Sequence, residues 1–192
     1  MKVLLLNGSP RKNGCTYTAL NVVADTLKAE GIDAEVFQAG DPDMENVKAA
    51  AVKLKESDAL VVGSPVYWAS PTGQIIEFMD RLASVAGKDM FYKPAAAVAS
   101  ARRAGTTATL DVLTKYFSYH QMPVVSSCYW NMVHGNTPEE VMKDEEGIQI
   151  MRILGKNMAW LLKCIEAGKK AGVAVPEAED KDKNQFYPIN YQ

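Results

Sequence analysis

Residues 7–16 (NGSPRKNGCT) join an apolar run to a segment with helical spacing, and their composition suits the binding of an anion. The start of a helix presents free backbone N–H groups and the positive end of the helix dipole. Ser9, Asn13 and Thr16 can donate side-chain hydrogen bonds to phosphate oxygens. Arg11 can supply positive charge there or lie in solvent. We therefore predict a phosphate-binding loop over these residues.

The spacing of the two glycines in this loop excludes the common nucleotide-binding loops. Five residues separate Gly8 from Gly14, whereas a Walker A loop has four, and Cys15 stands where its lysine would be. The G-x-G-x-x-G dinucleotide motif is absent, and so is the G-x-S-x-G motif of serine hydrolases.

Two further classes of phosphate-handling protein are excluded because this chain lacks the residues that they need. A phosphatase of the Cys-x5-Arg kind needs its arginine to hold the phosphoryl group, but Asn21, His134 and Lys170 occupy that position after the three cysteines. A response regulator needs acidic residues at the ends of the first and third strands. This chain has Asn7 and residues 63–64 (GS) at those places.

A second segment, residues 63–73 (GSPVYWASPTG), carries two aromatic rings and two prolines after an apolar run. Tyr67 and Trp68 offer flat apolar faces, and the amides of a stiff loop offer hydrogen bonds at fixed positions. Such a loop suits a planar heterocycle with a polar rim. The alternative is aromatic packing under the following helix, which would bury one of the two rings.

Two later segments follow the fourth and fifth apolar runs. Residues 100–107 (SARRAGTT) are small and polar and could line the far side of the same ligand. Arg102 and Arg103 could contact the phosphate of a second nucleotide or remain solvated. Residues 127–136 (SCYWNMVHGN) could form a lid or an interface, and His134 within them could contact a substrate.

The elements that must position these segments alternate regularly along the chain. Continuous apolar runs predict strands at 3–6, 32–37, 59–62, 95–99 and 123–126. Apolar residues at helical spacing predict helices at 16–30, 44–56, 72–86, 106–117 and 138–169. This alternation predicts an α/β fold with a five-stranded parallel sheet and helices on both faces. Ligands of such folds bind at the carboxyl ends of the strands, where the segments above lie.

Composition limits the class of protein. The 192 residues are 47% hydrophobic, which excludes disorder of the whole chain, and the net charge of −2 argues against nucleic acid as a partner. No apolar run approaches the roughly 20 residues that span a membrane. The three cysteines are scattered, which indicates a reducing, cytoplasmic location. The two histidines have no cysteine pair nearby, so we expect no metal site.

We expect one domain over residues 1–171 and a C-terminal tail or arm over residues 172–192. The tail is nearly all charged from 177 to 183, and then apolar character returns with Phe186, Tyr187, Ile189 and Tyr191. It is either a frayed end or an arm whose aromatic side chains pack on a partner subunit.

Three motifs together resemble the NADPH-dependent FMN reductase family of the flavodoxin-like fold: residues 5–14 (LLNGSPRKNG), 63–68 (GSPVYW) and 74–82 (QIIEFMDRL). The resemblance covers roughly residues 1–170. It implies a flavodoxin-like three-layer sandwich with strand order 2-1-3-4-5. It also implies a homodimer or homotetramer.

The resemblance further implies FMN held without a covalent bond, with its phosphate in the first loop. The cofactor-binding residues would be Ser9, Arg11, Asn13, Gly14, Cys15 and Thr16 around the phosphate, Pro65, Val66, Tyr67 and Trp68 beside the isoalloxazine, and Ser100, Ala101, Arg102 and Gly105 on its other side. Cys15 departs from the family pattern, in which a small polar residue often stands at this place. A thiol is a poorer hydrogen-bond donor than such a residue. The start of a helix could lower its pKa and make it sensitive to oxidation.

The implied activity is transfer of hydride from NAD(P)H to bound FMN and on to a small acceptor: a flavin, quinone, nitroaromatic or metal complex. We expect no catalytic side chain, because the cofactor performs the chemistry. The alternative is a flavodoxin-like electron-transfer module without its own NAD(P)H reaction, although flavodoxins tend to be strongly acidic. Related iron–sulfur flavoproteins carry a compact cysteine cluster. Three scattered cysteines cannot supply four thiolates, so we expect no such centre.

Overall fold

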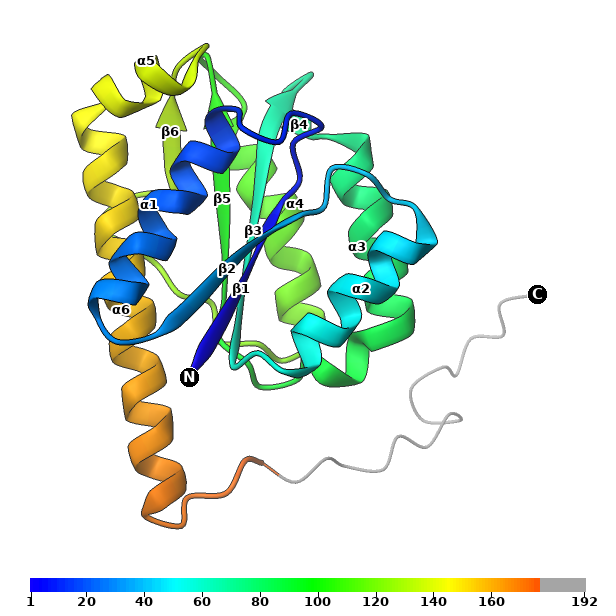
Figure 1. The fold of residues 1–192 in the computed structure, drawn as a ribbon, viewed down its shortest axis with the longest axis vertical. Helices are drawn as coiled ribbons and strands as arrows, with labels where there is room; N and C mark the ends of the chain where they lie inside the picture. Colours follow the sequence, from blue (N-terminus) through cyan, green and yellow to red (C-terminus); the bar gives the residue numbers. More distant parts are fainter. Residues whose placement is uncertain (177–192) are drawn as a thin grey trace.

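Five parallel strands form the central sheet of the computed structural model, which describes residues 1–176 (Figure 1). Their order is β2-β1-β3-β5-β6, and the short β4 pairs with β3 outside this path. The strands are β1 (Lys2–Asn7), β2 (Asp33–Gln38), β3 (Ala59–Tyr67), β4 (Ser70–Pro71), β5 (Ala95–Ala101) and β6 (Met132–His134). The parallel sheet and the order of its five main strands are confirmed, with β4 as an addition.

Helices cover both faces of this sheet (Figure 1). One face carries α1 (Cys15–Ala29), α5 (Pro138–Lys143) and α6 (Glu145–Lys170). The other carries α2 (Met44–Lys55), α3 (Gly73–Ala86) and α4 (Thr106–Tyr119), with the 3-10 turn η1 (Gly87–Asp89) after α3.

The apolar run of β1 explains why the sheet is buried on both sides. Val3, Leu4, Leu5 and Leu6 are all fully buried. Successive side chains of a strand point to opposite faces. Val3 and Leu5 therefore belong to the core under α1 and α6, and Leu4 and Leu6 to the core under α2 and α3.

The fifth strand lies later in the sequence than predicted. Residues 123–126 make only a single bridge to the sheet, between Val124 and Ala95, and regular pairing with β5 resumes at Met132. Pro123 has no N–H for a ladder, and the Val124 side chain is 49% exposed, so this apolar run does not form a buried strand. As a result, the residues that follow His134 lie at the carboxyl edge of the sheet.

The predicted helix over 138–169 is two helices rather than one. Asp144 interrupts it with a ψ of 78°, and its carboxylate accepts hydrogen bonds from the backbone N–H of Gly147 (3.0 Å) and His134 (2.7 Å). Thr137 caps the start of α5, because its hydroxyl accepts from the Glu140 N–H at 3.3 Å. The break allows α5 to close over the end of β6.

The tail expected over residues 172–192 is described only as far as Pro176. Both interpretations of its aromatic residues therefore concern residues outside the described part of the chain. Within residues 1–176, no helix combines the length and the apolar composition needed to cross a membrane.

Candidate functional site

A hollow of about 180 Å³ opens at the carboxyl edge of the sheet, among the loops that follow β1, β3, β5 and β6. Ten of the predicted site residues line it: Ser9, Arg11, Cys15, Thr16, Pro65, Val66, Tyr67, Ser100, Ala101 and Arg102. Three segments that are far apart in the sequence therefore meet at one place, as the topology of a parallel sheet requires.

The loop after β1 is shaped by the fully buried side chain of Asn7. Its Nδ2 donates to the Lys12 carbonyl (3.2 Å) and to Gln38 Oε1 (2.8 Å), and its Oδ1 accepts from the Ser9 N–H (3.2 Å). Gly8 is needed for close approach, since a Cβ at this position would lie 2.6 Å from Cγ1 of Ile75. The loop is thus fixed before any ligand arrives.

The start of α1 has the features of an anion site. Gly14 is its N-cap and offers no capping side chain. No hydrogen bond within residues 1–176 uses the backbone N–H groups of Cys15, Thr16 and Tyr17. These donors and the helix dipole face a loop that also carries the exposed cation of Arg11, so an anion would satisfy them.

Two hydroxyls join this helix to the end of β5. Oγ1 of Thr16 and Oγ of Ser100 lie 2.7 Å apart, and both residues are buried. One hydroxyl donates to the other. The accepting hydroxyl then keeps its own proton free for an acceptor in the hollow.

The loop after β3 is a tight hairpin. Tyr67 pairs with Ser70 across β3 and β4, and the two turn residues, Trp68 and Ala69, have φ values of 52° and 58°. Positive φ at both central residues is typical of a type I′ turn. Tyr67 lines the hollow, whereas Trp68 is fully exposed, so the alternative in which one ring packs under the next helix is wrong.

The hairpin is held at both ends. The Ser64 hydroxyl accepts from the Thr72 N–H at 3.1 Å, and the Thr72 hydroxyl donates to the Gly8 carbonyl at 3.1 Å. Gly105, with a φ of 98°, begins α4 beside the turn, and a Cβ there would lie 2.7 Å from Cα of Ala69. Gly105 therefore supports the hairpin and does not line the hollow.

Asn13, Gly14 and Trp68 also lie outside the lining of the hollow. Sequence reasoning missed two residues that do line it, Gly135 and Asn136. They follow β6, and the misplaced fifth strand hid them, because the only available signal was their position after an apolar run.

Burial raises the pKa of the Cys15 thiol above its ordinary value of 9.0, and it outweighs the backbone N–H of Cys15 and the charge of Arg11, which both lower this pKa. The expected net lowering of this pKa is therefore wrong, because burial has the larger effect. The thiol stays protonated near neutral pH, and its Sγ donates to the Gly135 carbonyl at 3.6 Å.

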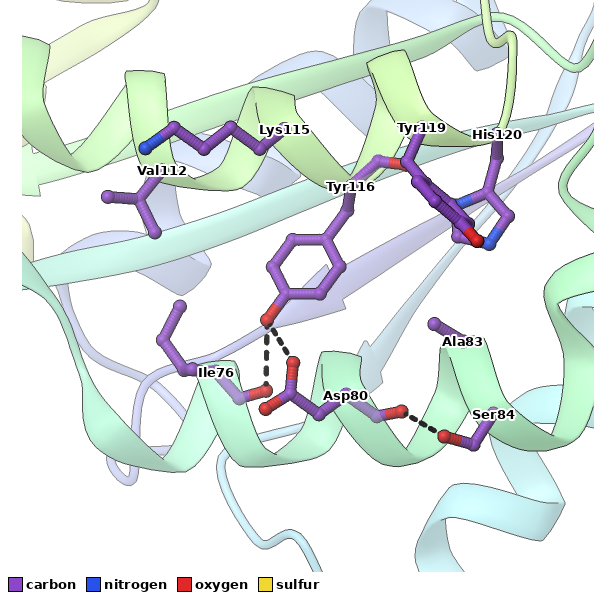
Figure 2. Close-up of a pocket in the computed structure, with 9 residues that line it drawn as sticks. All are labelled: Ile76, Asp80, Ala83, Ser84, Val112, Lys115, Tyr116, Tyr119 and His120. Carbon is purple, nitrogen blue, oxygen red and sulfur yellow. Dashed lines mark hydrogen bonds between the residues drawn. The ribbon is translucent and has the colours of Figure 1, made fainter. Parts of the chain in front are cut away.

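A larger hollow lies elsewhere in the described structure. It has a volume of about 700 Å³ and lies between α3 and α4 (Figure 2). None of the predicted site residues lines it. Of these two hollows, the smaller one brings together hydroxyls, a cation and unpartnered N–H groups, which are the groups that bind an anion.

The donor set of the smaller hollow fits FMN. The N–H groups at the start of α1, with Arg11 and the Thr16–Ser100 pair, suit the charge and oxygens of a phosphate. Pro65, Val66 and Tyr67 supply apolar surface for a flat ring.

Comparisons with known proteins find relatives of this chain among flavoproteins and reductases. An iron–sulfur flavoprotein of Methanocaldococcus jannaschii is 28% identical over 192 residues, covering 86% of this chain and 100% of that protein. An NADPH azoreductase of a Bacillus species is 29% identical over 108 residues, covering 53% of this chain and 59% of that protein.

A solved archaeal flavodoxin covers 85% of this chain and 99% of its own, with a TM-score of 0.65 and 19% sequence identity. At that identity the likeness establishes the flavodoxin-like fold. The model of the family described as NADPH-dependent FMN reductase matches residues 1–137, which is more than half of the chain. The chain therefore belongs to the NADPH-dependent FMN reductase family, as an oxidoreductase that binds FMN and takes electrons from NAD(P)H.

Proposed function

We propose that FMN binds in the hollow at the carboxyl edge, with its phosphate at the start of α1, and that the protein reduces a small acceptor. The observation that carries this proposal is the set of unpartnered N–H groups at Cys15, Thr16 and Tyr17, beside Arg11. An anion there gains hydrogen bonds and the helix dipole together. Ser9 and Arg102, which line the same hollow, complete the polar contacts.

Pro65, Val66 and Tyr67 would border the isoalloxazine, and Ala101 and Gly135 also line the hollow. When bound, FMN accepts a hydride from NAD(P)H and returns the electrons to an acceptor. The hollow of about 180 Å³ is smaller than the roughly 300–1,000 Å³ of a pocket that encloses a whole small molecule. It therefore encloses part of the cofactor and leaves the rest open to the nicotinamide and the acceptor.

The acceptor is a flavin, a quinone, a nitroaromatic or a metal complex. The azoreductase among the relatives supports an aromatic acceptor. The fully exposed ring of Trp68, next to Tyr67, offers such a molecule a surface to stack on. The flavodoxin-like alternative, a carrier without an NAD(P)H reaction, is disfavoured by family membership.

Electrons pass through the flavin alone in this chain. The relative from Methanocaldococcus jannaschii is an iron–sulfur flavoprotein, but a cluster takes four thiolates and this chain has three cysteines. Cys15 lines the hollow, whereas Cys128 and Cys164 are exposed on other segments. The three free thiols support a cytoplasmic location, and the open hollow supports a homodimer or homotetramer in which a second subunit covers the cofactor.

A visible spectrum tests the proposal directly. The protein is mixed with FMN, desalted and then treated with NADPH under nitrogen. We expect retained flavin absorbance that NADPH bleaches, and that returns when a quinone or a nitroaromatic is added. Retained flavin that NADPH leaves unbleached would favour the carrier, and failure to retain or bind FMN would overturn the proposal.

A further inference from the structure

His134 ends β6 and comes directly before Gly135 and Asn136, which line the hollow at the carboxyl edge. The end of β6 lies under α5 and beside the end of β5 (Figure 1). The His134 side chain is 44% exposed and does not belong to the lining of the hollow. Its contacts with the neighbouring segments therefore indicate what this residue does.

The imidazole of His134 lies between a carbonyl and a carboxylate. Nε2 lies 3.2 Å from the carbonyl oxygen of Arg103, and since this oxygen only accepts, Nε2 carries a proton. Nδ1 lies 3.8 Å from Oδ2 of Asp144, and the backbone N–H of His134 donates to the same oxygen at 2.7 Å. The side chain thus joins the loop after β5 to the start of α6.

Asp144 is a fixed partner for this ring. Its Oδ1 accepts from the Gly147 N–H at 3.0 Å, which caps the start of α6. A Cβ at Gly147 would collide with the Asp144 carboxylate, so the helix approaches it as closely as it can. The carboxylate is therefore placed by α6, and His134 meets it there.

The loop that His134 holds, residues 102–105 (RRAG), affects the flavin site in two ways. Arg102 lines the hollow, and Gly105 packs against the hairpin that carries Tyr67. Within residues 1–176, the bond from His134 to the Arg103 carbonyl is the only hydrogen bond that involves residues 102–104. Its loss would leave this part of the wall without a hydrogen bond to the rest of the protein.

We propose that His134 is a positioning residue of the flavin site, which holds residues 102–105 beside the hollow and holds them more firmly when its imidazole is charged. This inference rests on the proposed binding of FMN in this hollow. It gives His134 a role through the wall of the site rather than through contact with the cofactor.

Protonation strengthens both contacts of the ring. The neutral imidazole donates from Nε2 alone, so its Nδ1 presents a lone pair to the Asp144 carboxylate. The charged imidazole donates from both nitrogens, and its Nδ1–H then attracts the carboxylate. Histidine changes its charge between about pH 5 and 8, so we expect the loop to be held best at the acidic end of this range.

The Asp144 carboxylate, which is 20% exposed, is the charged group in contact with the ring. The other charged groups on the elements around His134 are exposed to solvent, which screens them. They are Glu139, Glu140 and Lys143 on α5, Glu145 and Glu146 on α6, and Arg102 and Arg103 on the loop.

Two substitutions separate the hydrogen bond from the charge. His134→Gln keeps an N–H donor for the Arg103 carbonyl but stays neutral, whereas His134→Phe keeps a ring and donates nothing. The Kd of FMN is measured for both variants and the unaltered protein by quenching of flavin fluorescence, between about pH 5.5 and 8. The ratio of two Kd values at one pH cancels the titration of the FMN phosphate, which all three proteins share.

At the alkaline end we expect His134→Gln to bind FMN like the unaltered protein and His134→Phe to bind about 3-fold more weakly. At the acidic end the unaltered protein should bind about 3-fold more tightly than His134→Gln. Asp144→Asn keeps an oxygen for the N–H groups of Gly147 and His134, and it should abolish this dependence on pH. His120→Gln, the control at the other histidine, should keep a constant ratio to the unaltered protein.

Alkylation of Cys15 provides a readout that needs no FMN. Its Sγ donates to the carbonyl of Gly135, the residue after His134. In a chain with Cys128→Ser and Cys164→Ser, without flavin and at a fixed pH, His134→Phe should raise the rate of alkylation by iodoacetamide about 3-fold because the wall opens more often. His134→Gln should restore the original rate.

The outcomes distinguish this inference from the proposed function. If the unaltered protein binds FMN but its Kd ratio to His134→Gln stays constant with pH, the inference is overturned and the flavin site stands. If the unaltered protein does not bind FMN, the proposed function fails, and equal alkylation rates in all three proteins would then overturn the inference as well. The comparison with His134→Gln remains decisive where His134→Phe folds poorly, since it keeps the hydrogen bond.

Discussion

The hydroxyls of Thr16 and Ser100 meet 2.7 Å apart in the lining of the hollow at the carboxyl edge and join the first turn of α1 to the end of β5. Thr16 is 1% exposed and Ser100 is 2% exposed, so this hydrogen bond lies out of bulk water. The same pair therefore links the start of α1 to the loop after β5 across the hollow and leaves one hydroxyl proton free to donate.

Thr16→Val tests this pair because it keeps the shape of the side chain and removes its hydroxyl. Ser100 then loses its partner, and a buried unsatisfied hydroxyl costs about 1–3 kcal/mol. We expect a lower Tm and an FMN Kd raised by about 10-fold or more, measured by quenching of flavin fluorescence. Thr26→Val, later on the same helix, is the control and should leave the Kd unchanged. An unaltered Kd in Thr16→Val would remove this pair from the site.

Arg11 can be tested by comparing two flavins that differ in one group. Arg11→Ala removes a cation from the loop at the start of α1, so it should weaken binding of FMN by about 3- to 10-fold at low salt. Riboflavin has no phosphate, and its Kd should not change. Lys12→Ala, at the exposed neighbouring position, should alter neither Kd. An equal loss of both flavins would mean that Arg11 contacts the ring or supports the loop instead.

A comparison of alanine substitutions at Gly105 and Gly31 distinguishes the cost of backbone strain from the cost of a steric clash. Both have positive φ, 98° and 78°, but a Cβ at Gly105 would lie 2.7 Å from Ala69, whereas a Cβ at Gly31 would meet nothing within 4 Å. Gly31→Ala should cost about 1 kcal/mol from strain alone. Gly105→Ala should cost at least about 2 kcal/mol and displace the hairpin that carries Tyr67. Urea unfolding of both variants measures this difference in the free energy of unfolding. Equal losses would show that the hairpin moves to accept the added Cβ at little cost.

The alternation of apolar runs and helical spacing was enough to predict the sheet, because β1 is buried on both faces and its sequence reads as continuous hydrocarbon. It also indicated that the loops after β1, β3 and β5 lie together, since parallel strands end at one edge, and these loops line one hollow. The predicted position of the fifth strand was wrong because residues 123–126 form a local apolar run. The pairing of Met132 with Ala99 instead depends on a partner that is distant in sequence. No local pattern encodes that choice.

The hairpin at Trp68 and Ala69 escaped prediction for a different reason. Type I′ turns are normally predicted from asparagine or glycine at the two central positions, because these residues tolerate positive φ. Here a tryptophan and an alanine adopt that conformation while Gly105 and Ser64 hold the hairpin from outside. The turn is thus set by tertiary contacts, and the sequence of the loop indicates only that it is stiff and aromatic.

Cys15 provides a probe of the hollow that does not depend on turnover. Burial raises its pKa above the ordinary 9.0, so its thiolate fraction at pH 8 is smaller than that of an unperturbed cysteine. Because the thiolate is the nucleophile, Cys15 should react slowly with iodoacetamide, and its rate should keep rising as the pH passes 9.0. The rate is followed by mass spectrometry in a chain with Cys128→Ser and Cys164→Ser.

Bound FMN should slow this alkylation further, since Cys15 lines the same hollow as Arg11 and Tyr67. Riboflavin should protect less than FMN, because Cys15 lies at the start of α1, where the phosphate is proposed to bind. Equal protection by both flavins would place the ring, rather than the phosphate, beside the thiol. No protection by either would move FMN out of this hollow while leaving the family assignment intact.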